Sequence, residues 1–156
     1  MKHLLQVEII DNNKSHQNLL FSVTGLTAEL KFDTYYFEVA DKEINDLKGL
    51  KNSVAKLFDY WLIKSKNLFE GDVIYLPIEF GDQGTGCLRV VNLSNEFYLT
   101  YGDSSRAGHS VSPINPGDYC YNITDFNDSC GKTIRVNKEE FIDAVKFVIH
   151  NLKNSS

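Results

Sequence analysis

The sequence is poor in cysteine, proline, methionine and tryptophan. It contains three cysteines, three prolines, one methionine and one tryptophan among 156 residues. The cysteines are odd in number and widely spaced (Cys87, Cys120 and Cys130), which argues against a disulfide framework and fits a reducing cytoplasm. A chain of this length can bury a core without covalent staples, so we expect one domain over residues 1–156.

Long hydrophobic runs are also missing. Residues 60–63 form a wholly apolar run of four, whereas a membrane-spanning helix needs about 20 apolar residues. At the N-terminus, Gln6 and Glu8 interrupt the apolar residues before the core of a signal peptide can form. We therefore expect a cytoplasmic protein that binds no membrane.

Basic residues are outnumbered by acidic ones. The sequence has 16 lysines and arginines against 21 acids, a net charge of −5, which disfavours attraction to phosphate backbones and predicts no nucleic-acid partner. Residues 67–130 carry nine of the acids, only two bases, and five of the eight tyrosines. Acidic side chains steer basic partners, and tyrosines are enriched at binding hot spots.

Two interpretations of this acidic, tyrosine-bearing segment remain open. The tyrosines can be ordinary half-buried strand residues beside solubilising acids, or they can form a surface that recognises a basic protein. For the second interpretation, the candidate partner-binding residues lie in the hairpins and the long middle loop. They are Asp82, Glu96, Tyr98, Tyr101, Asp103, Asp118 and Tyr119.

The hydrophobic pattern predicts an α+β fold, a largely antiparallel sheet of about six to eight strands packed against two amphipathic helices. The helices are expected at about 43–66 and 138–153, the second capped by Asn137 with Glu140 three residues on. Leu57, Trp61, Val145 and Ile149 should be buried. Strands are expected at 4–10, 19–23, 26–32, 35–39, 73–80, 86–91, 96–101, 119–123 and 133–136, with a short one at 109–111.

Motifs for chemistry are weak. Ser104 follows Gly102 and Asp103 as in one class of lipases, but no Asp-x-x-His block follows late in the chain. Cys87, His109, Cys120 and Cys130 lack the close pairs typical of structural zinc. Glu79 and Asp82 flank a turn and are assigned surface roles, and the glycine-rich 81–86 segment lacks the Lys-Ser/Thr ending of a P-loop. We expect no catalytic residue, no metal ligand and no cofactor.

The arrangement resembles the immunity proteins of bacterial contact-dependent growth inhibition and related polymorphic-toxin systems. The features that carry the resemblance are the aromatic segment 35–39, the helix with Trp61, the acidic hairpins at 73–101 and the capped helix after Asn137. The resemblance implies a non-enzymatic inhibitor that binds the toxin domain of its own system, often a basic nuclease. A small hydrolase-like enzyme and a non-catalytic adaptor or scaffold domain are the alternatives.

Overall fold

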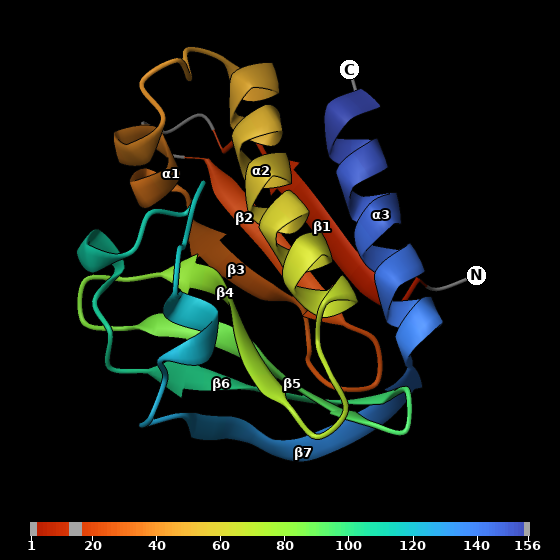
Figure 1. Cartoon of the computed structure of the whole chain (residues 1–156). Helices are drawn as coiled ribbons and strands as arrows, with labels where there is room; N and C mark the ends of the chain where they lie inside the picture. The colour runs from red at the N-terminus through yellow and green to blue at the C-terminus, as the bar shows by residue number, and fades with distance from the viewer. Residues whose placement is uncertain (1–2, 13–16, 155–156) are drawn as a thin grey trace.

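The computed structural model describes residues 3–12 and 17–154, which form two antiparallel sheets and three helices (Figure 1). The first sheet has the order β1-β2-β3 and the second has the order β4-β5-β6-β7. These elements confirm the predicted α+β class, but the strands form two sheets and not the single sheet that was predicted. The strands are β1 (Leu5–Ile10), β2 (Asn18–Val23), β3 (Leu30–Asp33), β4 (Val73–Phe80), β5 (Thr85–Leu93), β6 (Glu96–Ser104) and β7 (Asn127–Asn137). The helices are α1 (Tyr35–Ala40), α2 (Leu47–Lys66) and α3 (Lys138–Asn154), with 3-10 turns η1 (Gly108–Ser110) and η2 (Tyr119–Tyr121).

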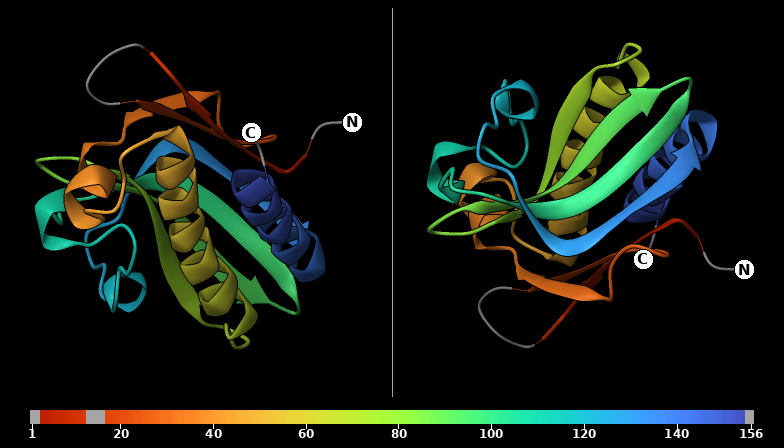
Figure 2. Two further views of the ribbon diagram at one scale, coloured as in Figure 1. Left: turned by 90° about the horizontal axis from the view of Figure 1, so that it is seen from above. Right: turned by 90° about the horizontal axis from the view of Figure 1, so that it is seen from below.

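The two long helices lie side by side against the sheets (Figure 2). Helix α2 turns its apolar face inward, and Trp61 is fully buried there, with its ring 5.9 Å from that of Phe21 on β2. The indole nitrogen donates a hydrogen bond of 2.9 Å to the carbonyl oxygen of Pro77 on β4. Trp61 thus ties one helix to both sheets. Leu57 and Val145 are buried as predicted, while Ile149 is only partly buried.

Both helices begin with a side-chain cap. Asp46 accepts a hydrogen bond of 2.7 Å from the backbone nitrogen of Gly49, so α2 begins at Leu47 despite the glycine in its first turn. Asn137 accepts one of 2.8 Å from the backbone nitrogen of Glu139, which confirms the predicted cap of α3.

Several predicted strands were wrong. Residues 35–39 form helix α1, where the carbonyl of Thr34 accepts from Phe37 and Phe37 packs edge-on against Phe80 at 5.7 Å. Residues 119–123 contain η2 and residues 109–111 overlap η1. The strand expected at 26–32 begins only at Leu30, because the chain first turns at Gly25 with φ +84°. In each case tertiary packing or a turn overrides a local preference for β structure.

Candidate partner-binding site

The seven predicted partner-binding residues do not share one surface. Asp82 and Asp103 lie at the end of the second sheet where β4 turns into β5, whereas Glu96 and Tyr98 lie at the opposite end of β6, about 20 Å away by strand length. Asp118 is exposed in the loop before η2. Tyr101 and Tyr119 are 6% and 0% exposed. These two rings belong to the core, which corrects the expectation that they line a surface.

Tyr119 is held in a network of hydroxyl groups on the face of the second sheet that residues 105–126 cover. Its Oη lies in a hydrogen bond of 2.9 Å with Ser104 Oγ, and a second hydrogen bond joins it to Thr85 Oγ1. Thr85 Oγ1 and Ser104 Oγ are themselves 2.7 Å apart. Ser104 is therefore engaged with two other hydroxyls in the interior. Burial raises the pKa of the nearby Cys87 thiol to about 12, so this cysteine stays protonated and unreactive.

A hollow at the turn end of the second sheet gathers the acids. Its volume is about 430 Å³, and the described residues that line it include the three carboxylates of Glu79, Asp103 and Asp125 but no basic side chain. We call this hollow the acidic pocket. The remaining lining residues are Gln83, Gly84, Thr85, Gly86, Ser104 and Ser105.

Strand pairing sets the geometry of the acidic pocket. Gly86 on β5 pairs with Glu79 on β4 and with Asp103 on β6, so the two carboxylates flank a glycine across three adjacent strands. A Cβ atom built on Gly86 would lie 2.5 Å from Tyr101 Oη and 3.1 Å from Glu79 Oε1. Only a glycine leaves room for the tyrosine hydroxyl and the carboxylate at this point.

The polar groups around Gly86 lack hydrogen-bond or ion-pair partners among the residues that the structure describes. Tyr101 Oη is buried and has no hydrogen-bond partner among the described residues. Glu79 is exposed as a whole residue, yet partial removal from water, and then the charge of Asp103, raise the pKa of its carboxyl. Burial, and then the neighbouring Glu79, raise the pKa of Tyr101. Glu79 and Asp103 make no ion pair within residues 3–12 and 17–154.

The other acids of this region already have partners. Asp82 accepts a hydrogen bond from the hydroxyl of Tyr36 on α1. Asp118 lies 3.6 Å from Arg106 Nη1 and accepts from Asn122 Nδ2 at 2.8 Å. Asp125 accepts from the backbone nitrogen of Ser105 at 3.0 Å, and hydrogen bonds from Ser105 lower its pKa. The unpartnered charge is thus concentrated at Glu79 and Asp103.

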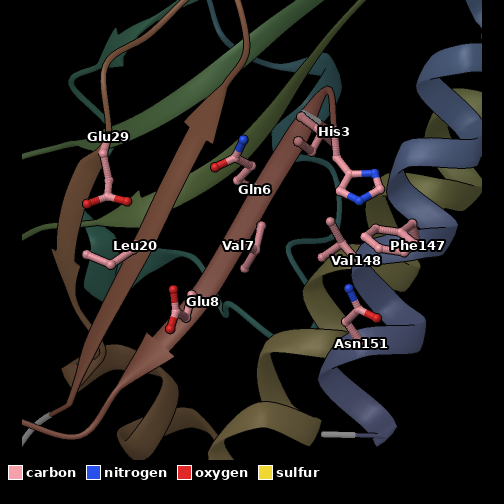
Figure 3. A pocket seen from close by; sticks show the side chains of 10 residues that line it. His3, Gln6, Val7, Glu8, Leu20, Glu29, Phe147, Val148 and Asn151 are labelled. Atoms are coloured by element: carbon pink, nitrogen blue, oxygen red, sulfur yellow. The ribbon is translucent and has the colours of Figure 1, made fainter. Parts of the chain in front are cut away.

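A second hollow lies between β1 and α3 (Figure 3). Its volume is about 370 Å³, and at one end the ring of His3 stacks on that of Phe147 at a centroid distance of 4.0 Å. Glu8 and Glu29 are its acids, while Val7, Leu20 and Val148 supply apolar atoms. Acidic, polar and apolar side chains line this groove, and β1, which borders it, is an edge strand of the first sheet.

Metal chemistry and membrane spanning find no support in the parts of the chain that the structure covers. There, no group of three or more His, Cys, Asp or Glu side chains is placed to hold a metal ion. Nor does any helix there have the length and apolar character to cross a membrane.

Comparison with known proteins identifies no family. No protein family model matches the chain, and no curated protein matches its sequence. Among solved structures, the chain is similar to one from the "CdiA-CT/CdiI toxin and immunity complex from Enterobacter cloacae". The two chains are 14% identical, the match covers 97% of each, and the TM-score is 0.46.

Sequence reasoning missed Glu79, Gly86 and Asp125 as a group. The register of β4 against β5 shifts between Pro77 and Glu79, so simple alternation does not show which face Glu79 takes. Gly86 counted only as part of a glycine-rich turn. The available signal was the density of acids in residues 67–130, which pointed to the right segment without separating partnered from unpartnered carboxylates.

Proposed function

We propose that this chain is an immunity protein, a non-catalytic inhibitor that binds the toxin domain of its own system through the acidic end of its second sheet. The observation that carries the proposal is the acidic pocket, in which Glu79 and Asp103 face one another without a basic neighbour. Such an arrangement is electrostatically unfavourable in the free protein and becomes favourable against a basic surface.

The chemistry of the remaining chain supports a binding role over the hydrolase alternative. In that alternative the nucleophile is Ser104. This residue is only 4% exposed, and its hydroxyl is hydrogen-bonded to the hydroxyls of Thr85 and Tyr119. A serine nucleophile requires a base that removes its proton, and neither partner is one at neutral pH. The cysteines are free thiols, with Cys130 exposed, which supports action in a reducing cytoplasm.

Co-expression tests the proposal. The protein encoded by the adjacent upstream open reading frame is produced with and without this chain, and survival only in its presence is the expected result. The Asp82→Lys/Asp103→Lys variant should slow association with that protein at least about tenfold and weaken its salt dependence, because long-range attraction is lost.

A matched control carries the same charge change elsewhere. Glu43→Lys/Asp143→Lys reverses two exposed acids outside the acidic pocket and should leave association nearly unchanged. Equal effects of both variants would show that association depends on the overall negative charge of the chain and not on the acidic end in particular. If the first variant neutralises and associates like the unmodified chain, the interface must be sought elsewhere, first at the groove between β1 and α3.

A further inference from the structure

We propose that the acidic pocket holds one arginine side chain of the partner, clamped between Glu79 and Asp103 with the Tyr101 hydroxyl as a third contact. This inference rests on the proposed function in that the arginine belongs to a partner protein. It adds the chemical identity of the group that the pocket recognises.

The spacing of the two carboxylates suits a planar cation. Glu79 and Asp103 project from β4 and β6 on either side of Gly86, and their strands are separated by about 10 Å, two interstrand distances. The place that a Gly86 side chain would take is filled by the Tyr101 hydroxyl and by Glu79. A flat group bound between the two carboxylates would therefore rest against the tyrosine hydroxyl.

The buried hydroxyl supplies the second, independent observation. Tyr101 Oη lies on the side of Gly86 where a Cβ atom would project, 2.5 Å from that position, and Glu79 Oε1 lies 3.1 Å from the same position. The hydroxyl has no hydrogen-bond partner among the described residues. A hydroxyl both donates and accepts. Rotation of the Glu79 side chain toward a bound cation opens Tyr101 Oη to accept from an N–H group of that cation. A group left unsatisfied in the free protein is satisfied in the complex.

Arginine fits these acceptors better than a metal ion or lysine. Among the described residues no three ligands converge as a metal site would require. A guanidinium presents five N–H donors in a fixed plane and is weakly hydrated, so it can serve two carboxylates and a hydroxyl at once. A lysine ammonium has three donors around one point and a tighter hydration shell.

The raised pKa of Glu79 agrees with this occupant. In the free chain, partial removal from water and the charge of Asp103 disfavour the ionised carboxyl. A cation placed between the two acids reverses the second of these effects, since opposite charges favour ionisation. Binding should therefore be coupled to release of a proton from Glu79 at mildly acidic pH.

The probe for the experiment is N-acetyl-arginine amide, which carries the guanidinium and no carboxylate. It is titrated into the ¹⁵N-labelled full chain while backbone amide resonances are followed by NMR. We expect saturable shifts at Gly86 and Asp103, with a dissociation constant in the millimolar range, and weaker binding of N-acetyl-lysine amide. Glu79→Gln should weaken binding at least about tenfold, and Tyr101→Phe should weaken it about threefold while the spectrum shows an intact fold.

Asp143→Asn is the matched control, because it removes one exposed acid of α3 that does not line the acidic pocket. Its affinity for the probe should stay within about twofold of the unmodified chain. Equal losses in Asp143→Asn and Glu79→Gln would overturn the arginine site and indicate a response to the overall negative charge. The absence of saturable shifts would also overturn the arginine site. Saturable binding combined with unaltered toxin neutralisation by Asp82→Lys/Asp103→Lys would leave the arginine site standing and contradict the proposed function.

Discussion

Tyr101 and Tyr119 are both buried against the second sheet, yet the surroundings of their hydroxyl groups differ. Tyr119 Oη bonds to Ser104 and Thr85 on the face covered by residues 105–126. On the face that meets the first sheet, the Tyr101 ring lies 6.3 Å from that of Phe21, and its hydroxyl has no partner within the described chain. Buried hydroxyls are normally paired, and among the described residues Tyr101 shares the lack of a partner with Ser53 and Ser65 on α2.

The difference separates a region that supports the fold from the region that we propose binds the partner. Around Tyr119 every named hydroxyl supports another, which stabilises the packing of the long loop. Around Tyr101, an unpaired hydroxyl, a glycine and two like charges occupy adjoining strands. In our proposal, this second arrangement lowers the stability of the free chain and provides a site for a cationic group. Stability and binding should therefore respond in opposite ways to changes in the two regions.

Trp61→Ala should have the largest effect on stability, because it removes contacts that join α2 to both sheets. The side chain is fully buried and its indole nitrogen is bonded to Pro77. Loss of the ring leaves a cavity, with an expected decrease of about 3 to 5 kcal/mol in the free energy of unfolding. Chemical denaturation measures this decrease. An unchanged transition would contradict the role of Trp61 as the anchor of the core.

Tyr119→Phe should come next. The substitution removes two hydrogen bonds and leaves Ser104 and Thr85 with only one another, at an expected cost of about 1 to 3 kcal/mol. The same denaturation experiment measures it. An unchanged free energy of unfolding would contradict the distinction between the two regions, since the hydrogen bonds of Tyr119 would then contribute nothing to stability.

Glu79→Gln should change the pH dependence of stability in a defined direction. The folded-state pKa of Glu79 is raised above its ordinary value of 4.5, so the unmodified chain loses stability as pH rises from the ordinary value through the raised one. Glutamine does not ionise and lacks this loss. The variant should thus gain stability relative to the unmodified chain at neutral pH and gain less at pH 4.

Asp118→Asn is the control for that comparison, because Asp118 sits beside Arg106. Removing its charge should bring no gain at neutral pH. If Glu79→Gln instead destabilises the chain at neutral pH, the unfavourable electrostatics of the acidic pocket are disproved. Thermal midpoints recorded between pH 4 and 8 decide the matter.

Tyr101→Phe should have the smallest effect on stability. Its hydroxyl has no partner among the described residues, so its removal should leave the free energy of unfolding within about 0.5 kcal/mol or raise it. A loss comparable to that of Tyr119→Phe would show that the Tyr101 hydroxyl is bonded in solution. The third contact of the arginine site would then need another residue.

The sequence predicted those parts of the fold that depend on regular local patterns. The apolar spacing along α2, the Asn137 cap of α3 and the three hairpin strands β4, β5 and β6 were all recovered. Residues 35–39 and 119–123 were misassigned because their aromatic rings favour strands locally. Packing of Phe37 against Phe80 and burial of Tyr119 hold these segments in helical turns instead.

The candidate site was recovered only as a segment. Its acids are visible in the sequence, but their partners are not: Asp118 finds Arg106 and Asp82 finds Tyr36 through contacts made after folding. The juxtaposition of Glu79, Gly86 and Asp103 depends on strand register and on the irregularity after Pro77. Burial of Tyr101 depends on the first sheet. None of these relations follows from local composition.

The most direct test of the account is the affinity of Glu79→Gln/Asp103→Asn for the toxin domain found by co-expression. Both substitutions keep the size of the side chain and remove its charge. The account predicts a dissociation constant at least about tenfold higher together with a thermal midpoint equal to or above that of the unmodified chain. Unchanged affinity in a variant of lowered thermal midpoint would show that the two carboxylates serve the fold, and would contradict the assignment of the acidic pocket as the binding site.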